Sequence, residues 1–265
     1  MYSVNYHRAT SVSEAAKLAG EGDAKFLSGG MTIIPAMKTR LAAPSDLIDL
    51  THIDGLSGIT VSGKSVTIAA ATTHYDVSKS DALRAVCPAM TDLASHIGDP
   101  HVRHRGTIGG SVANNDPAAD YPAALVAMDA TVVTDRREIA AAEFFTGLFE
   151  TALEDGEIIT AVKFNAPEQA GYEKFRNPAS RYAMVGVFVA KSGGGVKVAV
   201  TGAGDSGVFR SSEIESALSS SFAPSALDGV TVPSDSLMGD MHASPEYRAN
   251  LVVVMAKRAV AKAAA

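Results

Sequence analysis

Residues 25–34 read KFLSGGMTII, an apolar segment that runs directly into a Ser-Gly-Gly turn. We expect Lys25–Leu27 to be a strand and Ile33–Leu41 a helix despite Pro35, because their apolar residues follow extended and helical spacing respectively. A second buried strand is expected at Asp46–Leu50. Short units in which strands alternate with helices pair in parallel. The segment therefore predicts a small α/β unit with a glycine loop between strand and helix.

A helix is expected ahead of this segment. Ser11 and Glu14 have the spacing of a capping box before an apolar run, and Gly20 and Gly22 end that run. The first unit is therefore predicted to span residues 1–54.

The next part of the chain, residues 55–170, combines a hairpin with helices. Ser62-Gly63-Lys64 has turn chemistry between two apolar segments. The other elements expected here are a helix at 86–97, a loop without periodicity at 98–120, a helix at 121–128, and strands at 131–134 and 158–164.

Residues 171–265 differ in pattern from the rest. Three apolar segments with short connections predict an antiparallel sheet, namely Tyr172–Phe175, Met184–Ala190 and Val196–Thr201. Helices are expected at 212–219 and 245–263, joined by an exposed connection at 219–233. The predicted fold class is α+β, with two α/β subdomains and a C-terminal domain built on a three-stranded antiparallel sheet.

Composition excludes several classes of protein. The 265 residues carry a net charge of −6, which argues against nucleic acid as a partner. One cysteine, Cys87, cannot form an intramolecular disulfide, hold an iron–sulfur cluster or build a Cys-rich zinc site. No apolar run approaches the ~20 residues of a membrane span, and residues 1–8 lack the order of a signal peptide. We expect a cytoplasmic protein.

A second glycine loop lies at residues 105–111, which read RGTIGGS. Paired glycines let the backbone approach a ligand and turn N–H groups toward a phosphate. Either loop alone is equally well explained as a tight turn. Two such loops in one acidic chain favour a ligand with two phosphates, although neither has the Walker A or the G-x-G-x-x-G pattern.

The two loops and their flanks resemble the FAD-binding medium subunit of the molybdenum hydroxylases, the family of xanthine dehydrogenase and carbon monoxide dehydrogenase. Residues 28–35 resemble the first flavin motif and residues 106–111 the second. Residues 97–100 and 114–122 match the family nearly continuously, and the likeness extends through residues 157–160 and 172–175 to residues 201–204.

The resemblance implies a PCMH-type FAD-binding domain at residues 1–170, with subdomains 1–54 and 55–170, followed by the flavoprotein C-terminal domain at 171–265. It implies an oxidoreductase subunit that binds FAD and takes electrons from [2Fe–2S] clusters on a small subunit. A large subunit would hold the molybdenum cofactor, and a dimer of heterotrimers is expected. The external electron acceptor and the substrate stay open.

By position, the resemblance also implies the residues that contact FAD. The first loop would wrap the pyrophosphate, and the second would form the opposite wall. Asp120 would accept hydrogen bonds from ribose or ribityl hydroxyls, and Ile97 and Ile159 would pack on the rings. Lys174 would lie at the isoalloxazine edge and tune the flavin potential. The cofactor-binding set is Ser28, Gly29, Gly30, Met31, Thr32, Ile33, Ile97, Thr107, Gly109, Gly110, Ser111, Asp120, Ile159 and Lys174. No metal ligand and no catalytic side chain is expected.

The chain departs from the family pattern at three positions. Ser111 stands where relatives often have Asn, and Met31 cannot form a covalent link to flavin. Arg181 stands where NAD-reducing relatives carry an acidic residue, which argues against NAD as the electron acceptor.

Two other functions fit the residues less well. A stand-alone flavin oxidoreductase of the same broader fold would use its own NAD(P)H, and a phosphate-ligand scaffold would perform no redox chemistry. The histidines at 96, 101 and 104 lie among arginines, which would repel a divalent cation, so a metal site is not expected there.

Overall fold

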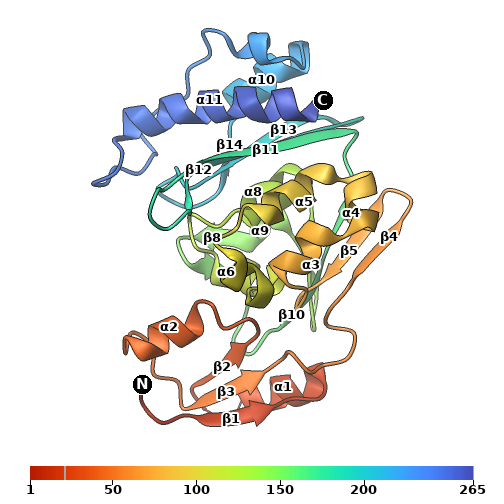
Figure 1. Ribbon diagram of the computed structural model, residues 1–265, viewed down its shortest axis with the longest axis vertical. Coiled ribbons are helices and arrows are strands. Elements are labelled where there is room, and N and C mark those ends of the chain that lie inside the picture. Colours follow the sequence, from red (N-terminus) through yellow and green to blue (C-terminus); the bar gives the residue numbers. More distant parts are fainter. Residues whose placement is uncertain (21, 265) are drawn as a thin grey trace.

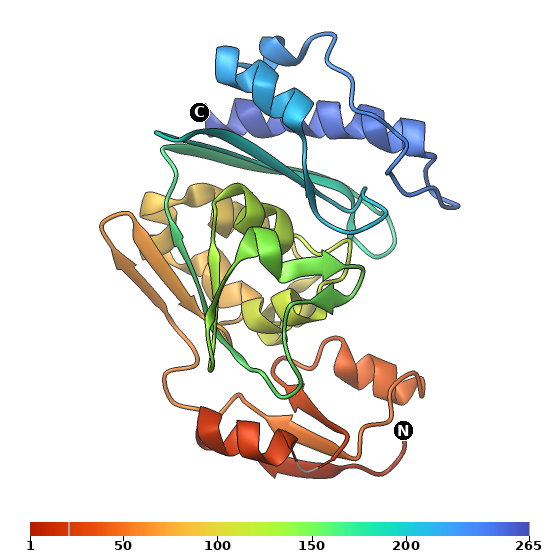
Figure 2. The same ribbon diagram turned by 180° about the vertical axis from the view of Figure 1, so that it is seen from behind.

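The computed structural model describes residues 1–20 and 22–264. Three regions follow one another along the long axis (Figure 1), with the N-terminal sheet at one end and helices α10 (Ser212–Ser220) and α11 (Pro245–Ala263) at the other. The view from behind shows the same order (Figure 2). Mixed helices and antiparallel sheets make the fold α+β, as predicted.

The first region is a parallel three-stranded sheet in the order β1-β3-β2. Its elements are β1 (Asn5–Arg8), α1 (Val12–Ala19), β2 (Ala24–Leu27), α2 (Ile33–Lys38) and β3 (Asp46–Asp49). The N-cap half of the predicted capping box is present, because Ser11 accepts a hydrogen bond from Glu14 N; Glu14 accepts its backbone bond from Thr10 N and not from Ser11 N. Strand β1 was not predicted because its residues are polar and mostly exposed.

The second region contains a five-stranded antiparallel sheet in the order β4-β5-β10-β6-β7 and a short hairpin. The strands are β4 (Ile59–Ser62), β5 (Ser65–Ala69), β6 (Thr131–Thr134), β7 (Glu138–Ala140), β8 (Phe145–Gly147), β9 (Glu150–Thr151) and β10 (Ile159–Asn165). The helices are α3 (His74–Lys79), α4 (Asp81–Val86), α5 (Pro88–Ser95), α6 (Pro100–Arg105), α7 (Ile108–Asn114), α8 (Tyr121–Ala127) and α9 (Ala141–Phe144).

The expectation of an irregular loop at 98–120 is wrong, because that segment contains α6 and α7. Each is a short helix that begins at a side-chain cap: Asp99 accepts from Val102 N, and Thr107 accepts from Gly110 N. Polar residues inside α6 and glycines and polar residues inside α7 hide the apolar period. Cys87 precedes α5 as predicted and is buried, which raises the pKa of its thiol to about 11.

The third region is an antiparallel sheet in the order β11-β12-β13-β14. It contains the three predicted strands and a short fourth one: β11 (Gln169–Arg176), β12 (Ala183–Ser192), β13 (Gly195–Thr201) and β14 (Phe209–Arg210). Helices α10 (Ser212–Ser220) and α11 (Pro245–Ala263) and the 3-10 turn η1 (Pro224–Leu227) complete it. Residues 219–233 are not wholly exposed as expected, because Leu227 is fully buried.

Helix α11 packs within its own region, against β11 and β12. The contact is close: a Cβ at Gly171 would lie 2.0 Å from the carbonyl oxygen of Ala259. The buried apolar residues form two clusters. One is the core of the first two regions and reaches one face of the C-terminal sheet, and the other lies between that sheet and helices α10 and α11. Across the part of the chain that the structure describes, no helix combines the length and the hydrophobicity of a membrane span.

Candidate functional site

A cleft of about 1080 Å³ lies where the three regions meet. Its lining residues come from the first region around β2 and α2, from the second region around α6 and α7, and from residues 179–182 after β11. Such a volume is at the upper end of the range for small-molecule sites. The cleft can therefore hold an extended dinucleotide cofactor.

The first glycine loop presents backbone donors to this cleft. Among the residues described, no acceptor bonds the N–H groups of residues 29 to 32. Gly30 has a φ of +74°, a conformation in which a side chain would be strained. Consecutive unbonded N–H groups in such a turn form an anion-binding concavity. The loop thus has the donors that a phosphate requires.

Close packing holds the two loops together. A Cβ at Gly29 would lie 2.0 Å from the carbonyl oxygen of Arg105, so only glycine permits this approach. The hydroxyls of Ser28 and Thr107 are 2.9 Å apart. The second loop also packs closely against the residue that follows β5, because a Cβ at Gly109 would lie 2.6 Å from Cβ of Ala70.

The second loop does not repeat the arrangement of the first. Ile108 N donates to Thr72 O, Gly109 N to Ala70 O, Gly110 N to Thr107 Oγ1, and Ser111 N to Thr107 O. The expectation that both loops turn unbonded N–H groups toward the ligand is therefore wrong for these four groups. Gly110 lies on the cleft and is exposed, so the second loop offers a wall without side chains at that point.

The cleft brings together all but one of the predicted cofactor-binding residues. The residues that line it are Ser28, Gly29, Gly30, Met31, Thr32, Ile33, Ile97, Thr107, Gly109, Gly110, Ser111, Asp120 and Ile159. Lys174 is the exception. Its side chain is 1% exposed, and its ammonium lies 2.8 Å from Oδ1 of Asp120. The structure therefore places Lys174 behind Asp120 and not at the surface of the cleft.

Three residues that follow Lys174 in sequence lie at the surface of the protein. Arg176 is exposed although it lies two residues from the buried Lys174 on β11, because the strand register shifts between Phe175 and Arg176. Arg181 and Tyr182 line the mouth of the cleft, and Tyr182 is 48% exposed. Partial burial raises the pKa of the Tyr182 hydroxyl, with a smaller contribution from the carboxylates of Asp116 and Asp120.

His74 is a cleft residue that the sequence did not reveal. It begins α3, is buried, and its Nδ1 lies 3.2 Å from the hydroxyl of Tyr121. Burial lowers the pKa of His74 to about 4, and the charge of Arg103 contributes. The imidazole is therefore neutral at physiological pH. The signal in the sequence that could have placed His74 at the start of a helix was Thr73, which caps α3.

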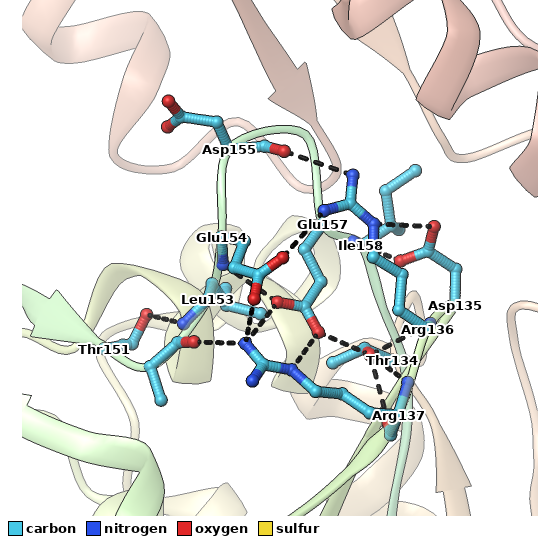
Figure 3. Close-up of polar contacts among 11 residues, drawn as sticks. Thr134, Asp135, Arg136, Arg137, Thr151, Leu153, Glu154, Asp155, Glu157 and Ile158 are labelled. Carbon is cyan, nitrogen blue, oxygen red and sulfur yellow. Dashed lines mark hydrogen bonds and ion pairs between the residues drawn. The ribbon is translucent and has the colours of Figure 1, made fainter.

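An ion pair between buried Glu157 and the exposed Arg137 fixes the cleft wall between β9 and β10 (Figure 3). Glu157 accepts hydrogen bonds from Arg137 at 3.0 and 2.9 Å, from Thr134 at 2.7 Å and from Glu154 N at 2.8 Å. These bonds, above all those from Arg137, lower the pKa of Glu157 to about 2. The turn that they hold, residues 153–157, lines the cleft and packs against the first region, since a Cβ at Gly156 would lie 3.6 Å from Cβ of Ala19.

The sequence of the chain matches a known family of cofactor-binding proteins. The profile of the family described as "FAD binding domain in molybdopterin dehydrogenase" matches residues 2–167. The carbon monoxide dehydrogenase medium chain of Afipia carboxidovorans is 34% identical over 99% of this chain and 97% of its own. The chain belongs to the molybdenum hydroxylase family as an FAD-binding medium subunit.

Other relatives share its whole length. The nicotine 6-hydroxylase medium subunit of Paenarthrobacter nicotinovorans is 32% identical over 99% of this chain and 98% of its own. The solved structure of reconstituted CO dehydrogenase from Oligotropha carboxidovorans contains a chain with a TM-score of 0.88 and 34% identity, covering 99% of this chain and 98% of that one.

The residues present fit FAD. The unbonded N–H groups of the first loop suit a pyrophosphate, and the glycines at 29 and 30 let the loop pack against Arg105 and adopt its positive φ. Ile97 and Ile159 give the cleft an apolar wall. The chain is thus an oxidoreductase subunit whose own residues form a cofactor cleft.

Proposed function

We propose that this subunit belongs to a heteromeric molybdenum hydroxylase, where it takes electrons from the [2Fe–2S] clusters of a partner subunit and passes them to an external acceptor. Bound FAD would supply the redox chemistry, because flavin exchanges electrons singly or in pairs. The observation that carries the proposal is the loop of unbonded N–H groups above a cleft lined by both glycine motifs.

The role of the protein residues is to bind and orient the cofactor. The N–H groups of residues 29–32 would hold the pyrophosphate, and the flat wall at Gly110 leaves space beside it. Asp120 would accept a hydrogen bond from a hydroxyl of the ribose or ribityl chain. Ile97 and Ile159 would exclude water from one side of the rings.

The assembly is proposed from the relatives. Medium chains and medium subunits are named as parts of larger dehydrogenases and hydroxylases, which supports a large molybdenum-cofactor subunit and a small iron–sulfur subunit as partners. We propose a dimer of such heterotrimers in the cytoplasm. The domains proposed within this chain are residues 1–54 and 55–170 for FAD and residues 171–265 for the C-terminal part.

Arg181 bears on the electron acceptor. It lies at the mouth of the cleft, where an acidic residue stands in NAD-reducing members that the sequence resembles. We propose an acceptor other than NAD, such as a quinone or a cytochrome. If so, NADH added without oxygen leaves the flavin absorption of the FAD-loaded chain unchanged. Rapid bleaching by NADH would contradict this and would favour a stand-alone NAD(P)H oxidoreductase.

The proposed assembly is tested by purifying an affinity-tagged copy of the chain from its native cells. We expect two additional subunits in the eluate, together with molybdenum, iron and FAD by elemental analysis and chromatography. A chain that elutes alone, with FAD but without iron or molybdenum, would contradict the assembly. A chain without flavin even after incubation with excess FAD would favour the scaffold function.

A further inference from the structure

Among the described residues, Asp120 forms hydrogen bonds and ion pairs through only one of its two carboxylate oxygens. Oδ1 accepts a hydrogen bond from the Tyr172 hydroxyl at 2.5 Å and lies 2.8 Å from the ammonium of Lys174. In the part of the chain that the structure describes, no donor bonds Oδ2. Because Asp120 lines the cleft while its side chain is 5% exposed, Oδ2 is the oxygen left for a ligand.

The two groups on Oδ1 come from one face of one strand. Tyr172 and Lys174 are two residues apart on β11, so both side chains point to the same side of the sheet. Gly186 on the neighbouring strand leaves room for them, since a Cβ there would lie 2.6 Å from the Tyr172 hydroxyl. Burial and the Asp120 carboxylate raise the pKa of Tyr172 well above its usual value, so it stays a neutral donor.

Among the described residues, Asp120 is the only ion-pair partner of Lys174. Its ammonium is buried, has no hydrogen bond of ordinary geometry among the described residues, and does not line the cleft. A buried carboxylate without a compensating charge is strongly unfavourable. The Lys174 charge therefore compensates Asp120 and sets the direction of its carboxylate.

The same sheet also holds the backbone of the segment that carries Asp120. The Thr201 hydroxyl donates to Ala119 O at 2.6 Å, and Gly202 N donates to Pro117 O at 2.8 Å. Thr201 belongs to β13, so two strands of the C-terminal sheet fix one short segment at the edge of the cleft. The C-terminal region thus contributes to the site through Asp120.

We propose that Lys174 and Tyr172 are positioning residues that set cofactor affinity by holding Asp120, with no direct contact to the cofactor. This inference rests on the proposed binding of FAD. It differs from the sequence expectation, in which Lys174 lies at the isoalloxazine edge. It also makes the C-terminal sheet part of the FAD-binding function, although that sheet lies on the other side of Asp120 from the cleft.

The test is a double-mutant cycle on FAD affinity, measured by titrating the flavin-free chain with FAD. We expect Lys174→Met and Asp120→Asn each to weaken binding by at least tenfold. The double variant should bind no more weakly than Asp120→Asn alone. The exposed neighbour provides a matched control, because Arg176→Met should leave the affinity unchanged.

Stability without FAD gives a second readout. Lys174→Met leaves Asp120 buried without compensation, so adding Asp120→Asn to it should raise the denaturant midpoint. If Lys174→Met does not fold, Tyr172→Phe replaces it in the cycle, since it removes one hydrogen bond and no charge. We expect Tyr172→Phe to weaken FAD binding only when Asp120 is present.

Additive losses of affinity would overturn the inference, because they would mean that Lys174 contacts the cofactor independently of Asp120. A double variant less stable than Lys174→Met would overturn it as well. Failure of the unmodified chain to bind FAD is a different result: it removes the proposed function and, with it, the inference that depends on it.

Discussion

The hydroxyls of Ser28 and Thr107 lie 2.9 Å apart although 79 residues separate them in the chain. Ser28 belongs to the loop after β2 in the first region, and Thr107 caps α7 in the second. The hydrogen bond therefore joins two regions whose sheets are separate. It places the two glycine motifs on the same cleft, which neither region forms alone.

Gly29→Ala tests whether the close approach of the two loops is required. The new Cβ would lie 2.0 Å from the carbonyl oxygen of Arg105, which is rigid backbone, so the loops must separate. We expect the free energy of unfolding to fall by about 1–3 kcal/mol, as for other overpacked sites, and FAD binding to be lost. Gly193→Ala is the control, because, its chain neighbours apart, no atom of the described residues lies within 4 Å of its Cβ position. Equal FAD affinity in both variants would contradict the packing account.

Gly110→Asp tests the wall of the cleft. A Cβ at Gly110 meets only Thr107 Oγ1, at 3.0 Å, so the chain should still fold. The added carboxylate would repel the cofactor phosphates, and we expect no measurable FAD binding. Gly110→Asn adds nearly the same volume without the charge and should retain more affinity. Stoichiometric FAD in Gly110→Asp would show that the pyrophosphate lies elsewhere.

How far the sequence predicts the site depends on the kind of residue. The glycine loops are local patterns, so residues 28–33 and 107–111 could be assigned to one ligand from the sequence alone, and both loops line the cleft. Lys174 was misplaced because burial behind Asp120 is a tertiary property that a strand pattern does not contain. His74 and Glu157 were missed since their neighbours in space, Tyr121 and Arg137, are distant in sequence.

The fold shows the same division. The parallel first sheet and the antiparallel third sheet follow from their apolar periods, and both were predicted. Helices α6 and α7 were not, because each has fewer than two full turns and contains polar or glycine residues where a core helix would be apolar. Their side-chain caps, Asp99 and Thr107, were the signals in the sequence.

Glu157→Gln tests the ion pair that fixes the turn at residues 153–157. The variant loses charge-assisted hydrogen bonds, and we expect a loss of about 1.5–3 kcal/mol in the free energy of unfolding at pH 7. The pKa of Glu157 is about 2 in the fold, below its usual 4.5, so its contribution is complete above pH 4.5 and is lost as the pH falls toward 2. Denaturant titrations at pH 7 and pH 3 should therefore show a smaller difference between the two proteins at pH 3. A constant difference would contradict this.

His74 predicts a separate loss of stability at mildly acidic pH. Its pKa falls from 6.5 to about 4 on folding, so between these values the unfolded chain binds the extra proton. The free energy of unfolding should then decrease as the pH falls, and His74 should account for about 2 kcal/mol between pH 7 and pH 5. His74→Gln should remove this part of the pH dependence, measured by denaturant titration at both pH values. An unchanged slope in the variant would assign the effect to other groups.

The central claim is that this chain binds FAD in the cleft between the two glycine loops. The most direct measurement is the visible absorption spectrum of the purified chain, followed by chromatography of the compound that heat releases. The account predicts a yellow protein that releases FAD and not FMN, in equal amount to the chain. A colourless protein that stays colourless after incubation with FAD, alone and with its partner subunits, would contradict it.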